Sequence, residues 1–132
     1  MVAPADAQVS PEFFRAVQAA CRACEQWDDD AIAYAATHVP VYAERRATPQ
    51  QARAAGCRTC IYLGLWADEW PGYGSHPHGI IWLFEDGIRQ TASQNEADLT
   101  NVVIAVLHHE LEHALQRDHV LDAMERQRAA RR

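Results

Sequence analysis

The sequence predicts an α+β domain with helices at its start, strands in its middle and one long helix near its end. A Ser-Pro pair at residue 10 opens an amphipathic helix, and residues 61–66 and 80–84 are apolar runs of strand length. Residues 96–116 contain no Gly or Pro. A chain of 132 residues suits one domain. We expect residues 1–56 to be mainly helical, residues 57–122 to hold the strands and the long helix, and residues 123–132 to form a basic tail.

Three helices are expected in the first part of the chain. Ser10 is a favourable N-cap, and the proline after it suits the first helical position. This helix carries apolar side chains three and four residues apart, at Phe13, Phe14, Val17, Cys21 and Cys24. The aspartates at 28–30 offer a cap for a second helix that runs to about Thr37. Thr48 begins a short third helix, which ends at Gly56.

Three strands are expected. Residues 39–42 form a short strand, whose proline favours an edge position or the first residue. Residues 61–66 form the second, and the continuous apolar run 80–84 is typical of a well-covered third strand. Between them, the Gly- and Pro-rich residues 70–79 form a loop. Residues 85–87 are expected to close the third strand with a turn.

The long helix is expected to begin near Ser93. Ser93 and Glu96 stand three residues apart, as in a capping box. Apolar side chains then cover about two-thirds of the circumference of the helix. The pattern predicts a central, mostly buried helix.

This helix carries an HExxH pattern at residues 109–113. His109 and His113 lie one turn apart, about 40° from each other around the helix axis, so both imidazoles can reach one metal ion. Glu110 lies at about 100°, beside the ligands, where it can act as general base for water that the metal activates. The pattern therefore predicts a catalytic zinc site with Glu110 as the base.

A third ligand is expected at His119, six residues after His113. On a straight helix His119 would point away from the other two histidines. The helix must therefore break between about Leu115 and Asp118 and turn the chain back. Asp118 and Asp122 are the alternative ligands.

On these motifs, residues 61–122 resemble the small bacterial zincin-like metallopeptidases of the minimal HExxH type. Members have a Leu-Gly-Leu-Trp-like strand, a Gly/Pro loop, an apolar edge strand and then the HExxH helix. They carry a third ligand at the place of His119, often Asp after a Gly turn, whereas here Gln116 stands at the glycine position. The third His is similar to the metzincin pattern.

The resemblance implies a zincin-like half-domain, in which a small mixed β-sheet lies over the active-site helix. It implies that strand 80–84 is the edge strand and pairs with an extended peptide or protein substrate, with contacts from Ile80 and Trp82. In the preceding loop Tyr73 and His78 are further candidates for substrate binding. They are also, with His76, candidates for stabilising the oxyanion.

The four cysteines form two CxxC pairs, Cys21 with Cys24 and Cys57 with Cys60. Three states remain open for them: a second, structural Zn²⁺ bound by all four, buried free thiols, or disulfides if the protein is exported.

Charge narrows the function classes. The formal charge is −6, all basic residues are arginine, and four arginines fall within residues 126–132. Removing these four positive charges leaves residues 1–125 at −10, so we expect no nucleic-acid partner.

The sequence shows no membrane span and no signal peptide, and a cytoplasmic protein is expected. A catalytically inactive zincin-like binding or regulatory module and a metal-dependent endoribonuclease with three histidines are the alternatives to a zinc peptidase. The oligomeric state is not predicted.

Overall fold

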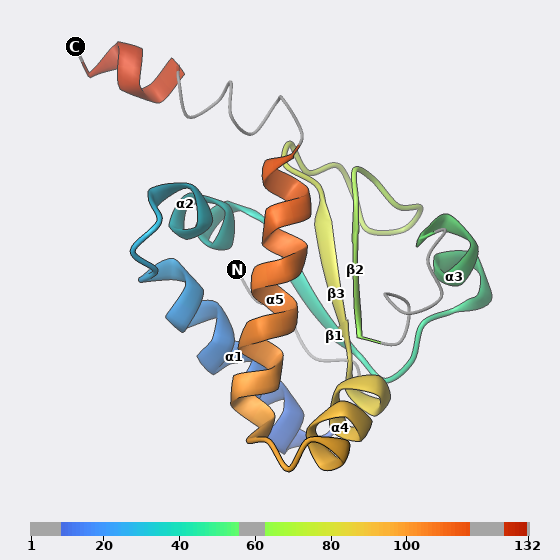
Figure 1. Cartoon of the computed structure of the whole chain (residues 1–132). Helices are drawn as coiled ribbons and strands as arrows, with labels where there is room; N and C mark the ends of the chain where they lie inside the picture. Colours follow the sequence, from blue (N-terminus) through green and yellow to red (C-terminus); the bar gives the residue numbers. More distant parts are fainter. Residues whose placement is uncertain (1–8, 56–62, 117–125, 132) are drawn as a thin grey trace.

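The computed structural model of this chain describes residues 9–55, 63–116 and 126–131, and it confirms the predicted α+β class (Figure 1). Helices α1, α2 and α5 pack together on one side of a three-stranded sheet, and α4 lies at the end of the sheet where α5 begins. The elements are α1 (Pro11–Glu25), α2 (Asp30–His38), β1 (Val41–Glu44), α3 (Pro49–Ala55), β2 (Gly64–Ala67), β3 (Ile80–Phe84), α4 (Glu85–Gln94) and α5 (Leu99–Leu115).

The sheet is mixed, with strand order β1-β3-β2. Strand β1 runs parallel to β3, with Val41 opposite Ile81, and β2 runs antiparallel to β3, with Gly64 opposite Leu83. The expectation that residues 80–84 form an edge strand is therefore wrong. Both sides of β3 are hydrogen-bonded to neighbours, which explains why every residue of this strand is buried and apolar.

The side chains of β3 alternate between two apolar clusters. Ile81 and Leu83 face the large core that α1, α2 and α5 share with the sheet. Ile80, Trp82 and Phe84 face the opposite side, where they pack with Leu65 and with the partly buried rings of Tyr42, Trp70 and Tyr73. This alternation places α5 and a separate aromatic cluster on opposite faces of the sheet.

The predicted helix starts in the first part of the chain are confirmed. The Ser10 hydroxyl accepts a hydrogen bond from the Phe13 N–H (3.1 Å), and the Asp29 side chain caps α2. At the start of α3, Thr48 and Gln51 bond each other reciprocally, backbone to side chain, as in a capping box.

Two predicted boundaries after β3 are wrong. Residues 85–87 begin helix α4 instead of a turn, and Ser93 lies inside that helix. Glu96 adopts a left-handed conformation (φ 50°) in the link to α5. The N-cap of α5 is Asp98, whose carboxylate accepts from the Asn101 N–H (3.2 Å). Asp98 is also a favourable N-cap residue, and it caps α5 in place of the predicted Ser93–Glu96 capping box.

Helix α5 is less buried than its apolar pattern predicts. Its fully buried residues form one stripe, at Val103, Leu107, Glu110, Leu111 and Ala114. A second stripe is exposed, at Asn101, Ala105, His109 and Glu112. The sheet, α1 and α2 cover the first stripe and leave the second open. No helix in the described ranges has the length and hydropathy that a membrane span requires.

A buried carboxylate joins the start of α1 to α4. Glu85 accepts hydrogen bonds from the Ser10 N–H (2.9 Å), the Ser10 hydroxyl (2.7 Å) and the Arg89 guanidinium (2.6 Å). Burial alone would raise the pKa of Glu85, but the bonds from Ser10 and Arg89 outweigh it and hold the pKa below its ordinary value. The ionised form is therefore the one that the fold stabilises.

We expect Glu85→Gln to lower the free energy of unfolding at pH 7 by about 2 kcal/mol, because charged hydrogen bonds are lost from a buried site. Since the pKa of Glu85 is lowered in the folded state, its contribution is present above the ordinary value of 4.5 and disappears as the pH falls through the folded value. Urea denaturation at several pH values should show the variant and the wild type converging in acid. The exposed Glu69→Gln is the control, and an equal effect of both variants would contradict the prediction.

Candidate metal centre

The two histidines of the HExxH pattern point at a common position. His109 and His113 lie on successive turns of α5, and their Nε2 atoms are 3.1 Å apart. Two nitrogen ligands of one tetrahedral zinc ion lie about 3.3 Å apart, from Zn–N bonds of about 2.0–2.1 Å. The two rings are therefore already spaced as a pair of metal ligands.

The surroundings favour the neutral form of His113. Its burial and the nearby His109 lower its pKa, against an opposing contribution from Glu112. A neutral imidazole keeps the lone pair that binds a metal ion.

Glu110 lies beside this pair on the buried stripe of α5, with 2% of its surface exposed. One atom each from His109, Glu110 and His113 lie within 4.8 Å of one another. Burial raises the pKa of Glu110 to about 7, and its Oε2 has no hydrogen-bond partner among the described residues. An unpaired buried carboxylate is costly, so its place beside two histidines fits a metal site and a proton-accepting role.

Glycine in β2 allows Glu110 to lie this close to the sheet. A Cβ atom at Gly64 would lie 3.1 Å from the Trp82 carbonyl oxygen, 3.1 Å from Val106 Cγ1 and 3.2 Å from Glu110 Cγ. Any larger residue would push β2 away from α5 at the candidate base.

Helix α5 ends early enough for His119 to be the third ligand, which requires a break between about Leu115 and Asp118. The helix ends at Leu115, and Gln116 is its C-cap, with its N–H directed at the carbonyl oxygens of Glu112 and His113. A ligand from the following chain requires such an early end. His119 itself, and the alternatives Asp118 and Asp122, lie outside the described residues, so the third ligand remains a prediction.

The residues expected to contact substrate on β3 lie in the core. Ile80 and Trp82 are fully buried on the face of the sheet opposite α5. Tyr73 packs edge-on against Trp82 (ring centroids 5.3 Å) and donates a hydrogen bond to Glu44. Burial and the bond to Glu44 raise the pKa of Tyr73 to about 12. These three side chains stabilise the aromatic cluster, on the other side of the sheet from the histidine pair.

The two loop histidines are held by neighbouring elements. His78 Nε2 lies 3.4 Å from the Tyr34 hydroxyl, and the His78 carbonyl accepts from the Trp66 indole (3.1 Å). His76 Nε2 lies 2.9 Å from the Tyr73 carbonyl oxygen. The two contacts of His78 connect the loop to Tyr34 of α2 and to Trp66 of β2. The metal group of the described residues is His109, Glu110 and His113, so the part of the two loop histidines in binding or oxyanion stabilisation remains a prediction.

Cys21 and Cys24 are free and buried on the face of α1 that enters the core. Burial raises the pKa of each thiol to about 11, so both are protonated at neutral pH. Cys57 and Cys60 lie outside the described residues. The described part of the chain shows the first CxxC pair as buried thiols, and the four-cysteine zinc site remains a prediction.

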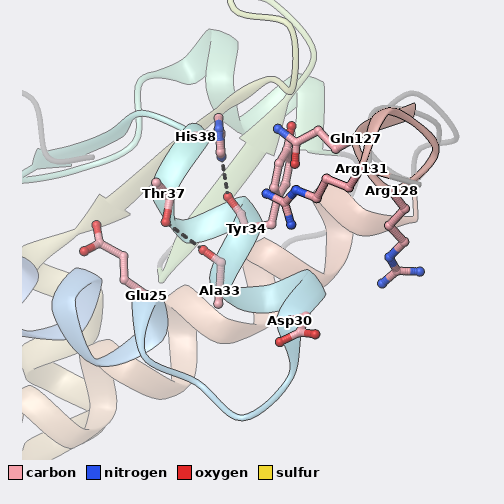
Figure 2. Close-up of a pocket in the computed structure, with 9 residues that line it drawn as sticks. All are labelled: Glu25, Asp30, Ala33, Tyr34, Thr37, His38, Gln127, Arg128 and Arg131. Carbon is pink, nitrogen blue, oxygen red and sulfur yellow. Dashed lines mark hydrogen bonds between the residues drawn. The ribbon is translucent and has the colours of Figure 1, made fainter. Parts of the chain in front are cut away.

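A cavity of about 480 Å³, which the histidine pair does not line, lies between the end of α1, α2 and the last described segment (Figure 2). Glu25 and Asp30 line it opposite Arg128 and Arg131, and Tyr34 lies between them. Part of the basic tail thus lies near acidic side chains of the helical layer.

A groove that the sequence did not reveal lies next to the histidine pair. It has a volume of about 550 Å³, and His109 and Glu110 line it together with residues from α4, β2 and the first half of α5. The exposed stripe of α5 through Asn101 and Ala105 was the available signal. Ala105 lies on the arc that the apolar pattern leaves free, but a helical pattern alone does not show that α4 and β2 form a groove there.

No family model matches the chain, and comparisons with curated proteins and with solved structures also give no match. The assignment of a candidate metal site therefore depends on the geometry of α5 and on the HExxH pattern.

We expect His109→Ala and His113→Ala each to weaken Zn²⁺ binding about 100-fold or more, because loss of even an outer-shell partner costs about 10–100-fold. Calorimetric titration of the apoprotein with Zn²⁺ measures the effect. His108→Ala is the matched control, since His108 lies on the same helix but bonds Glu112 (2.9 Å) and packs on Trp27. Equal affinity in all four proteins would contradict the site.

We expect Gly64→Ala to destabilise the fold by about 1–3 kcal/mol, and Gly64→Val to cost more, because the added atoms meet the Trp82 backbone and two α5 side chains. Urea denaturation measures the cost. A valine variant as stable as the wild type would show that β2 and α5 are not in tight contact at Glu110.

Proposed function

We propose that this chain is a zinc-dependent metallopeptidase that hydrolyses peptide bonds with Glu110 as general base. One observation carries the proposal: two histidines with Nε2 atoms 3.1 Å apart lie beside a buried glutamate whose Oε2 has no hydrogen-bond partner in the described ranges. An HExxH helix with this arrangement is typical of zinc peptidases.

The roles follow from the donor atoms. His109 and His113, through Nε2, and His119 as the third ligand would hold the ion. When bound, zinc supplies a Lewis acid that polarises the scissile carbonyl and lowers the pKa of water toward about 7. Glu110 accepts a proton from the attacking water at its carboxylate and delivers it to the leaving amine. Burial of Glu110 keeps this proton transfer away from bulk solvent.

The substrate would lie along β2, which takes the place expected for residues 80–84. The Phe84 N–H donates to the Leu63 carbonyl (3.0 Å), so in this antiparallel register the backbone groups of Gly64 point away from β3. An extended peptide can pair with that edge and pass over the histidine pair. This placement supports a peptide substrate for the site.

Two features favour peptide over RNA. A three-histidine endoribonuclease has no need for a glutamate at position 110, whereas a peptidase uses one as its base. Residues 1–125 also carry a formal charge of −10, which opposes binding of a phosphate backbone.

We expect Glu110→Gln to lower peptide cleavage about 100-fold or more while Zn²⁺ remains bound, because general base catalysis contributes about 10²–10⁴-fold. Turnover of casein by the zinc-loaded full chain, with zinc content measured in parallel, tests this. Glu112→Gln, an exposed acid on the same helix, is the control and should keep most of the activity.

The other outcomes identify the alternatives. Zinc binding at a ratio near one, without cleavage that depends on Glu110, would indicate an inactive zincin-like binding module. Cleavage of RNA in place of casein would indicate the endoribonuclease.

A further inference from the structure

The groove beside the candidate metal centre is lined mainly by apolar and small side chains. It lies between the first half of α5, the end of α4 and the start of β2, and its volume is about 550 Å³. Its apolar lining consists of Leu63, Gly64, Ala97, Val102, Ala105 and Val106. Ligand sites are typically concave and mostly apolar, with volumes of roughly 300–1,000 Å³.

The groove is continuous with the residues that carry the proposed chemistry. His109 and Glu110 line one end of it, and Ala105 lies one helical turn before His109 on the exposed stripe of α5. Val106 faces Gly64, where a Cβ would lie 3.1 Å from it. A group in the groove would therefore lie directly beside a bond held at the histidine pair.

The remaining lining is polar but uncharged. Thr91, Asn95 and Asn101 supply hydroxyl and amide groups, and apart from Glu110 and His109 the described lining residues carry no ionisable side chain. Away from the end that holds His109 and Glu110, a charged substrate side chain would lose its hydration without an opposite charge to pair with, which is unfavourable. A large uncharged apolar side chain has no charge to desolvate and gains from leaving water.

We propose that this groove binds a large apolar side chain, such as leucine or phenylalanine, next to the bond that is cleaved, and that Ala105 sets the size it accepts. The inference rests on the proposed peptidase function for its substrate. Gly64 lines the groove and lies on the strand edge where the peptide would pair, and alternate side chains of a paired peptide point toward the helix side of the sheet. One of them enters the groove.

The first test maps cleavage sites in casein digested by the zinc-loaded full chain. The wild type should cleave next to large apolar residues at one fixed position. Ala105→Phe adds a ring at an exposed helix position and should lower kcat/KM for such sites about 10-fold or more, while sites with alanine or glycine there are retained. Gln90→Phe places the same ring on exposed α4 outside the groove and should keep the wild-type preference. An unchanged preference in Ala105→Phe overturns the inference.

The second test measures binding without catalysis. N-acetyl-phenylalanine amide, titrated into the zinc-loaded chain, should shift the NMR signals of Ala97, Ala105 and Val106 saturably, and N-acetyl-alanine amide should not. Ala105→Phe should abolish these shifts, and their absence in the wild type overturns the groove as a binding site. Saturable binding without cleavage would retain the groove and reject the peptidase. Cleavage without binding of the phenylalanine amide and without a sequence preference would retain the peptidase and reject the groove as its binding site.

Discussion

The close contact between β2 and α5 at Gly64 determines the rest of the site. Because Gly64 has no side chain, β2 lies directly against Val106 and Glu110. A Cβ atom at this position would lie only 3.1–3.2 Å from these two side chains. This contact buries Glu110 beside the histidine pair. It also brings the outer edge of β2 to one wall of the apolar groove. One glycine thus places the candidate base, the proposed peptide-binding edge and the groove within the same few residues.

The two buried glutamates show what the fold does with a carboxylate in each case. Glu85 receives three hydrogen bonds, and its pKa is lowered, so it stabilises the junction of α1 and α4 as an anion. Glu110 receives none at Oε2 from the described residues, and burial raises its pKa to about 7. A buried carboxylate stabilises the fold when hydrogen-bond donors surround it. A buried carboxylate without such donors destabilises the fold. The cost at Glu110 is understandable if a proton must be taken up there.

The sequence predicted most of the features that depend on neighbouring residues. Each feature that the sequence predicted correctly joins residues no more than four positions apart. These features are the helix caps at Ser10, Asp29 and Thr48 and the pairing of His109 with His113. One error is local, since Asp98 and not Ser93 caps α5, whereas the other errors concern contacts between distant segments. Strand β3 is central because β1, about forty residues earlier, pairs with it, and α4 begins at Glu85 because Ser10, 75 residues away, holds that carboxylate. No local pattern encodes such partners.

The same distinction explains the part of the site that was missed. In the helical pattern Ala105 falls on the narrow arc outside the apolar stripes, and it is exposed because the described elements leave that side of α5 open. The uncovered stripe is the one that carries His109. A helix that is apolar around most of its surface but covered on only part of it must leave apolar surface in water or bind something there. The apolar groove beside Ala105 begins one turn before the metal-binding pair, so a substrate group next to a bond held at His109 and Glu110 would reach it.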